Sequence, residues 1–206
     1  MTLSKRLANI CEFVPEGSNV IDVGADHALV SIYLNKHKNC TCLATDISKE
    51  CIKSAENNIK KSKAIVNTKV TDGLKDIDYK DSIIIISGMG TNTIIKILNT
   101  PIREDLIICS HKDIPLLRKT MHNKGYYINK EEVVFDKRYY VITHYKYGKR
   151  KKTNYIVSPF LIHNHEYMKH LLDYYNIKYT NSVTILDKIK YYKVVKKINK
   201  ILQKRK

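Results

Sequence analysis

Short apolar runs and amphipathic stretches alternate along the first 145 residues, and this alternation constrains the fold more than any other feature. Helical spacing separates most of the runs, so a mainly parallel sheet with helices on both faces is expected. The last two runs follow one another directly, which predicts a closing antiparallel pair. The sequence therefore predicts a seven-stranded, mixed, Rossmann-like α/β sheet. Its strands are expected at residues 19–23, 41–46, 66–71, 82–87, 106–109, 127–135 and 139–147, and its helices at 3–13, 27–36, 49–61, 91–99 and 114–124.

Beyond Pro159 only helical spacing remains, over residues 160–176 and 182–204. Polar residues between these two stretches supply a turn, so an antiparallel, coiled-coil-like helical hairpin is expected. We predict a first domain over residues 1–152 and this helical extension over residues 153–206. The apolar stripes that should pack within the hairpin are Leu161, Met168, Leu172 and Tyr175 on the first helix, and Ile185, Ile189, Tyr192, Val195, Ile198 and Leu202 on the second.

Positive charge is concentrated in the C-terminal part. Residues 1–144 carry 21 basic and 17 acidic side chains, whereas residues 145–206 carry 16 and 3. Such a segment favours a polyanionic partner, because each phosphate that it neutralises releases counterions. A solvated lysine-rich surface is the alternative, and a membrane surface fits less well because the tail lacks a broad stripe rich in Phe and Leu. The candidate nucleic-acid contacts are Lys149, Arg150, Lys151, Lys152, Lys193, Lys196 and Lys197.

Several classes of protein are disfavoured by what the chain lacks. The five cysteines form no C-x-x-C pair and no zinc spacing with the eight histidines, so no metal site is predicted. The first residues lack the apolar core of a signal peptide, and no apolar run reaches transmembrane length. We therefore expect a reduced protein of the cytoplasm without a membrane partner. A monomer is also expected, although no sequence pattern bears on the oligomeric state.

One glycine, Gly24, follows the first predicted strand, within the segment Asp22–Ala28. A glycine lets the backbone approach a ligand closely, and the start of the next helix offers unpaired N–H groups. A dinucleotide-binding turn needs G-x-G-x-x-G, but here Asp26 and His27 stand near the place of the second glycine. The turn therefore fits a smaller ligand with an amino acid end, such as S-adenosylmethionine. An ordinary strand-to-helix junction is the alternative.

Acidic residues also end the next two strands. Asp46 lies 22 residues after Gly24 and can accept hydrogen bonds from both ribose hydroxyls. Asp72, before Gly73, can accept from an adenine amine. Three acidic strand ends in succession favour a methyltransferase, with S-adenosylmethionine as cofactor.

Ser87–Gly90 follow the central strand, where a methyltransferase of this kind holds the acceptor. The Asn/Asp-Pro-Pro-aromatic sequence usual in enzymes that methylate exocyclic amines is absent. Two glycines that simply end a strand are the alternative.

These motifs resemble the bacterial tRNA (adenine(22)-N1)-methyltransferases of the TrmK type, and the resemblance covers nearly the whole chain. It implies a class I S-adenosylmethionine-dependent methyltransferase fold, and methylation of N1 of adenine 22 in the D-arm of tRNA. The matching segments are Val20–Leu29, Ala44–Ile47, Asp72–Leu74, Ser87–Gly90, Ile94–Leu98 and Lys137–Ile142. The cofactor-binding residues expected on this basis are Asp22, Gly24, Asp46, Ile47, Asp72, Gly73, Ser87, Gly88 and Met89.

The chain departs from that family at three places. Leu29-Val30-Ser31 replace a usual Tyr-Leu-Pro, Thr91 replaces a glycine, and Cys109-Ser110-His111 replace Gln-Pro-Asn. The first and third changes fall beside the expected base pocket. They keep two alternatives open: a methyltransferase for another RNA site or for a protein, and an RNA-binding protein that retains the fold with weak or no catalysis.

A mechanism follows from the acceptor atom. N1 of neutral adenine carries a lone pair, so the site needs positioning and negative charge rather than a base. Asp26 is expected to accept from the adenine N6 amine, with His27 orienting Asp26 or contacting the base, and both are predicted to be catalytic. The alternative is that Asp26 binds the cofactor's ammonium group and His27 caps the helix.

Overall fold

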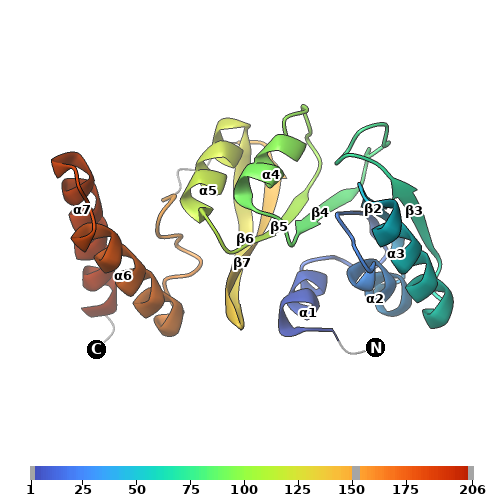
Figure 1. Cartoon of the computed structure of the whole chain (residues 1–206), viewed down its shortest axis with the longest axis horizontal. Coiled ribbons are helices and arrows are strands. Elements are labelled where there is room, and N and C mark those ends of the chain that lie inside the picture. The colour runs from blue at the N-terminus through green and yellow to red at the C-terminus, as the bar shows by residue number, and fades with distance from the viewer. Residues whose placement is uncertain (1–2, 150–153, 204–206) are drawn as a thin grey trace. The chain divides into compact units, whose positions relative to one another are not determined.

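The computed structural model describes residues 3–149 and 154–203. The chain divides into two compact units between residues 151 and 152 (Figure 1). The first unit holds the sheet with its helices, and the second holds a pair of helices.

The sheet of the first unit has seven strands in the order β3-β2-β1-β4-β5-β7-β6. The pairs among β1 to β5 are parallel, and β7 runs antiparallel to both β5 and β6. The predicted seven-stranded mixed sheet, with the strand order of a class I methyltransferase, is confirmed. The strands are β1 (Asn19–Val23), β2 (Thr41–Asp46), β3 (Val66–Val70), β4 (Ile83–Ser87), β5 (Leu106–Ser110), β6 (Tyr126–Asp136) and β7 (Arg138–Tyr147).

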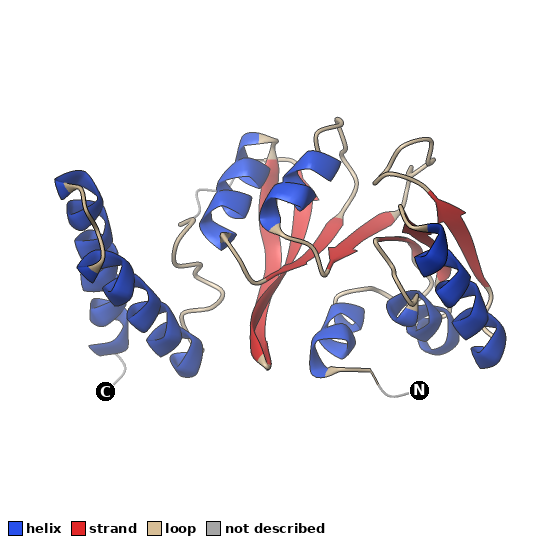
Figure 2. Ribbon diagram, in the orientation of Figure 1, coloured by secondary structure: helices blue, strands red, loops and turns tan. Residues whose placement is uncertain are grey.

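Helices cover both faces of this sheet (Figure 2). The central strands are apolar on both faces for this reason, and Ile84, Ile85 and Ile86 of β4 are fully buried. Helices α1 (Lys5–Glu12), α2 (Leu29–Lys38) and α3 (Lys49–Ser62) pack on one face, and α4 (Thr91–Ile97) and α5 (Ile114–Asn123) on the other.

The order of the strands places a switch point between β1 and β4. From β1 the chain moves outward through β2 to β3, then returns to the other side of β1 and continues through β4 to β5. Ligands of open α/β sheets bind at the carboxyl ends of the strands beside such a switch point. The return from β3 to β4 passes through residues 71–82, which form no helix.

Helix α2 begins two residues later than predicted, at Leu29 instead of His27. Asp26 and Ala28 both have left-handed backbone conformations, with φ of 50° and 53°. A left-handed residue cannot belong to a right-handed helix. Asp26 and His27 therefore lie in a tight turn between β1 and α2, rather than in the first turn of the helix.

The second unit contains α6 (His165–Thr180) and α7 (Ile185–Gln203). The helix predicted over residues 160–176 corresponds to α6, which begins five residues later than predicted. The Asn164 side chain accepts the Tyr167 N–H at 2.9 Å and caps α6 there. The two helices pack around a cluster that is centred on Met168, Tyr175, Val194 and Ile198.

Part of the predicted packing stripe on α7 is wrong. Ile185, Ile189 and Tyr192 are 77%, 47% and 52% exposed. They belong to the half of α7 next to the turn, whereas the buried residues Val194 and Ile198 lie in the other half. None of the helices within residues 3–149 and 154–203 combines the length and hydropathy needed to cross a membrane.

Candidate active site

A cleft of about 800 Å³ lies at the carboxyl ends of the strands. Small-molecule sites enclose roughly 300–1,000 Å³, so the cleft has room for a nucleoside-sized ligand. The ends of β1 and β2 form one side of the cleft, and the loop after β3 and helix α4 form two others. The lining residues are Val23, Gly24, Asp46, Ile47, Thr71, Asp72, Gly73, Leu74, Lys75, Asp76, Ile77, Tyr79, Met89, Thr93, Lys96, Ile97 and Thr100.

Gly24 lines the cleft at the end of β1. Its φ is +71°, and a Cβ added to it would lie 2.0 Å from the Cε atom of Met89. The N–H groups of Gly24 and Ala25 donate to the Thr45 carbonyl at 2.8 and 2.9 Å, which fixes the turn to β2. The structure therefore brings together Gly24 and Met89, which the sequence predicted separately for the cofactor.

Asp46 lines the cleft at the end of β2. Its Oδ2 atom accepts the Asp26 N–H at 3.2 Å, and its Oδ1 atom accepts the Ser48 N–H at 2.9 Å. A carboxylate has about four acceptor positions, so two remain for a diol. Ile47, beside it, is 67% exposed and lines the cleft as an apolar surface.

Asp72 and Gly73, both predicted to bind the cofactor, line the cleft after β3. Gly73 has φ +64°, and a Cβ there would meet Ile97 of α4 at 3.2 Å. Lys75 and Lys96 also line the cleft, although the sequence did not predict them. One sequence signal could have pointed to this wall of the cleft. Residues 71–82 lack helical spacing, although they connect β3 to β4 across the sheet.

Asp22 is buried, with 4% exposure, and is not among the residues that line the cleft. Its Oδ2 atom accepts the Ser31 hydroxyl at 2.9 Å, so it holds the first turn of α2. Burial raises the pKa of Asp22 from 3.8 to about 6, and the hydrogen bonds from Ser31 oppose this. A buried carboxylate with a raised pKa is typical of functional sites.

The raised pKa of Asp22 gives a stability prediction. A carboxyl group whose pKa is higher in the folded state favours folding at low pH and loses that contribution as pH rises from about 4 to about 6. We expect Asp22→Asn to be more stable than the wild type by about 3 kcal/mol at pH 8, with the difference declining toward pH 4. Urea unfolding at several pH values measures this; a difference that does not change with pH would contradict it.

Asp26 and His27 lie together at the turn before α2. The Nε2 atom of His27 is 3.5 Å from Oδ2 of Asp26, and their side chains are 54% and 59% exposed. On the other side of the ring, Nδ1 lies 2.8 Å from the Ser54 hydroxyl of α3. Asn58, one turn further along α3, donates to the His27 carbonyl at 3.1 Å.

This arrangement bears on the predicted roles. The His27 side chain does not cap α2, because it faces Ser54, and the N-cap residue Ala28 makes no side-chain hydrogen bond. Neither Asp26 nor His27 is among the residues that line the cleft. Asp26 nevertheless donates its backbone N–H to Asp46, and Asp46 does line the cleft. Ser54 and Asn58 were missed because only the fold brings α3 to this turn.

The loop after β4 contains the other predicted cofactor residues. Met89 lines the cleft, but Ser87 and Gly88 are not among the lining residues. Thr91, next along the chain, has its hydroxyl 3.3 Å from that of Ser110 and donates to the Lys112 carbonyl. Two positions at which the chain departs from the TrmK type are thus in contact.

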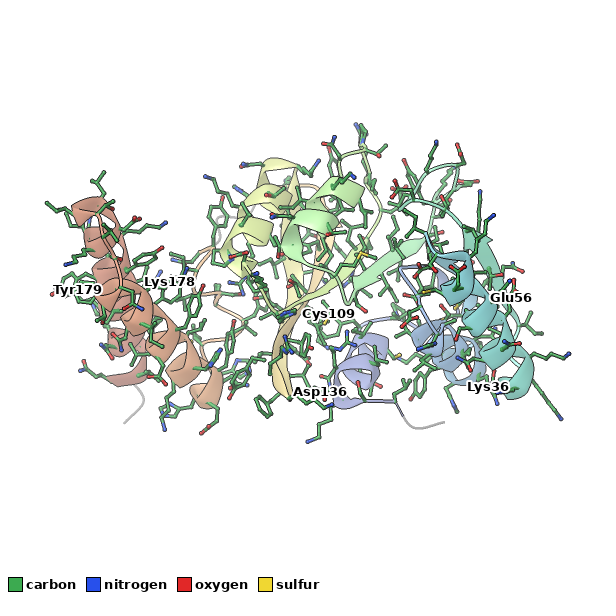
Figure 3. The ribbon with its side chains drawn as sticks, viewed as in Figure 1. Lys36, Glu56, Cys109, Asp136, Lys178 and Tyr179 are labelled. Atoms are coloured by element: carbon green, nitrogen blue, oxygen red, sulfur yellow. The ribbon has the colours of Figure 1, made fainter. Side chains whose placement is uncertain are left out.

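Cys109, at the same departure, is a buried thiol. Burial raises its pKa to about 11, so it stays protonated and unreactive at neutral pH. Figure 3 labels it within the sheet.

The predicted RNA contacts are divided by the structure. Lys149 is exposed after β7, and Arg150, Lys151 and Lys152 lie outside the described residues. On α7 the remaining three are exposed, while the neighbouring Val194 and Ile198 are buried. These three lysines, which therefore share the solvent-facing side of the helix, are Lys193, Lys196 and Lys197.

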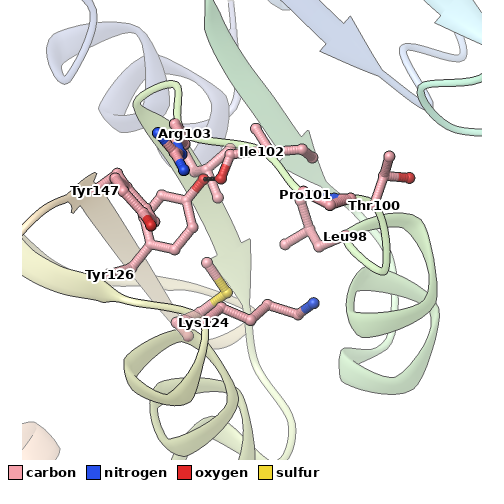
Figure 4. Close-up of a pocket in the computed structure, with 10 residues that line it drawn as sticks. Leu98, Thr100, Pro101, Ile102, Arg103, Lys124, Tyr126 and Tyr147 are labelled. Carbon is pink, nitrogen blue, oxygen red and sulfur yellow. Dashed lines mark hydrogen bonds between the residues drawn. The ribbon is translucent and has the colours of Figure 1, made fainter.

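A second cavity, of about 160 Å³, lies near the amino end of β5 (Figure 4). The Tyr126 hydroxyl donates to the Ile102 carbonyl at 2.8 Å, and the Arg103 guanidinium lies 5.3 Å from the Tyr147 ring centroid. This second cavity is smaller than the usual range for cofactor sites. The larger cleft is therefore the candidate cofactor site. Within residues 3–149 and 154–203, no three His, Cys, Asp or Glu side chains are grouped so as to hold a metal ion.

Comparison with known proteins agrees with this geometry. A family model described as a methyltransferase domain matches residues 3–143. The chain is 33% identical over 102 residues to the tRNA (adenine(22)-N(1))-methyltransferase of Bacillus subtilis, and 30% identical over 98 residues to the ribosomal protein L11 methyltransferase of Thermosipho melanesiensis. The matches cover 48% and 47% of this chain, and 43% and 38% of those relatives, so less than half of each relative is spanned.

A solved structure extends the likeness in fold to the whole chain. TrmK of M. capricolum, solved in complex with S-adenosyl-homocysteine, superposes with a TM-score of 0.80 over 98% of this chain and 97% of that one. The identity between the two is 24%. The superposition therefore includes the C-terminal helices as well as the sheet.

Proposed function

Because the chain belongs to the methyltransferase-domain family, we propose that it transfers a methyl group from S-adenosylmethionine to N1 of an adenine in tRNA, adenine 22 of the D-arm. The observation that carries this proposal is the cleft at the carboxyl ends of the strands. The one relative named above for a tRNA substrate acts, by its name, on N1 of adenine 22.

The residues present fit S-adenosylmethionine. Gly24 lines the cleft without a side chain, so its backbone can approach a ligand closely, and Met89 packs against it where a Cβ would lie. Asp46 retains acceptor positions for the ribose hydroxyls, and Asp72 is available for the adenine amine. When bound, the cofactor supplies a methyl group on a positively charged sulfur.

Asp22 and the loop after β4 complete this assignment. Asp22 places negative charge beneath the turn and holds the start of α2, so it supports the cofactor's cationic amino acid end from outside the lining. Met89 packs over Gly24, and Ser87 and Gly88 set the path of the backbone toward it.

Asp26 and His27 act on the acceptor in this proposal. The Ser54 hydroxyl can donate to Nδ1, which leaves the proton of a neutral imidazole on Nε2, facing Asp26. Asp26 then has a fixed direction and keeps a charged oxygen for the N6 amine of the base. Methylation at N1 creates a positive charge on the base, which a nearby carboxylate stabilises.

The C-terminal unit supplies the tRNA contacts. Residues 145–206 carry most of the excess positive charge, and the three exposed lysines of α7 share one side of that helix. N1 lies on the Watson–Crick edge, so the target adenine must leave any base pair before it reacts. Recognition of folded tRNA through phosphates and shape fits such a surface. We place this activity in the cytoplasm, whose reducing conditions suit five free cysteines, and we assign it to a monomer.

The experiment that tests the function is a single-turnover assay with labelled S-adenosylmethionine and an unfractionated tRNA pool. We expect N1-methyladenosine as the labelled nucleoside, mapped to position 22 by primer extension. A different methylated nucleoside would indicate another RNA site. Label in ribosomal protein added as a competing substrate would favour a protein methyltransferase, and no label at all would favour an RNA-binding protein without catalysis.

A further inference from the structure

Basic side chains from three distant parts of the chain meet around Tyr140. The Arg6 guanidinium lies 5.1 Å from the centroid of the Tyr140 ring, and the His111 ring packs edge-on against it at 5.3 Å. Arg138 donates to the Nε2 atom of His111 at 3.4 Å. Arg6, His111, Arg138 and Tyr140 are called the Tyr140 cluster below.

The cluster lies at the same edge of the sheet as the cofactor cleft. His111 directly follows β5, which is parallel to β4 and, through it, to β1. Ser110 at the end of β5 pairs with Val141, so Arg138–Tyr140 extend beyond that end. In Figure 3, Asp136 marks the neighbouring β6–β7 turn beside α1.

This position is informative because the cofactor cleft occupies the ends of β1, β2 and β3. The end of β4 lies between the cleft and the cluster in the strand order. If the target base reacts beside the cofactor, the sugar–phosphate backbone of the RNA next to that base would therefore be within reach of the ends of β5 and β7.

The charges of the cluster suit an anion. Burial lowers the pKa of His111, and the neighbouring Arg138, Lys112 and Arg6 lower it further. A neutral imidazole can accept the Arg138 N–H and orient the guanidinium without adding repulsion.

The charge of Arg6 acts on one carboxylate, that of Asp136, whose pKa it helps to lower. Asp136 accepts the backbone N–H of Arg6 at 3.2 Å. Within the described parts of the chain, the ion pairs formed by carboxylates involve neither Arg6 nor Arg138. Arg138 is exposed, and Arg6 is half-buried against Tyr140.

We propose that the Tyr140 cluster binds a backbone phosphate of the RNA beside the target nucleotide. Guanidinium groups form paired hydrogen bonds with phosphate, and the contact with Tyr140 holds one of them in place. The cluster adds a second RNA contact, in the catalytic unit, to those of the C-terminal unit. This inference rests on the proposed function and specifies where the RNA lies across the sheet.

The test compares Arg138→Gln with Lys61→Gln. Both changes remove one exposed positive charge from the first unit, but Lys61 lies in the last turn of α3, away from the carboxyl ends of the strands. Affinity for folded tRNA is measured by fluorescence anisotropy at several salt concentrations. We expect Arg138→Gln to weaken binding about tenfold and to reduce the slope of log K against log salt by about 0.7–0.9, as for one lost phosphate contact.

Three further measurements make the outcome decisive. Cofactor affinity and melting temperature should be unchanged in both variants, and Arg138→Lys should recover part of the affinity because the charge is kept. Equal RNA affinity and salt slope in Arg138→Gln and Lys61→Gln, with a wild type that methylates tRNA, would overturn the cluster alone. A wild type that binds no RNA would overturn both the cluster and the proposed function.

Discussion

Gly24→Ala is expected to weaken S-adenosylmethionine binding by about a hundredfold. The new Cβ would lie 2.0 Å from the Cε atom of Met89, so either Met89 or the turn after β1 must move. Both line the cleft, and each movement changes the surface on which the cofactor lies. Isothermal titration with S-adenosylmethionine measures the loss.

Gly17→Ala is the matched control. Gly17 has φ +73°, nearly the same as the +71° of Gly24, but a Cβ there would meet no atom within 4 Å. Both substitutions should lower the free energy of unfolding by about 1 kcal/mol or more, because a left-handed conformation is unfavourable for alanine. Only Gly24→Ala should lose cofactor affinity. Equal cofactor affinity in the two variants would show that close approach at Gly24 does not matter for binding.

Asp26→Asn is expected to lower the methyl-transfer rate by about a hundredfold while leaving cofactor affinity within a few-fold of wild type. The loss is typical of removing one charge that stabilises a transition state. Asparagine tolerates the left-handed backbone at this position, where φ is 50°, so the turn should keep its shape. Single-turnover kinetics with saturating cofactor and tRNA separate the rate from binding.

The alternative role of Asp26 gives the opposite result. If Asp26 held only the ammonium group of the cofactor, the variant would lose cofactor affinity and recover its rate at saturating cofactor. A normal rate together with normal affinity would exclude both roles. Ser54→Ala serves as a companion variant, because it alters the orientation of His27 without touching Asp26.

Most of the fold was predictable from the sequence because short-range patterns specify it. The seven strands lie within a few residues of their predicted positions. The central strands β4 and β5 are mostly apolar because both of their faces are buried. Boundaries were less accurate where a backbone conformation or a cap decides them. The starts of α2 and α6 depend on the left-handed turn at Asp26–Ala28 and on Asn164, respectively.

The candidate site was predictable only in part. Asp46 is the last residue of β2, and Gly24 and Asp72 come one and two residues after β1 and β3, so their place at one edge of the sheet follows from parallel strand order. Asp22 differs, because it lies inside β1, which is buried on both faces of the sheet, and there it bonds to Ser31. No local pattern distinguishes these two outcomes.

The sequence by itself determined which stretches are strand or helix and that Gly24, Asp46 and Asp72 stand at the ends of the first three strands, because each depends on neighbours within a few positions. The tertiary structure decided what meets at those ends. The contact of Ser54 with His27, the wall formed by residues 71–79 and the gathering of Arg6, His111 and Arg138 all join segments far apart in the chain. Such contacts arise only when the sheet closes in the order β3-β2-β1-β4-β5-β7-β6, since that order sets which loops share an edge.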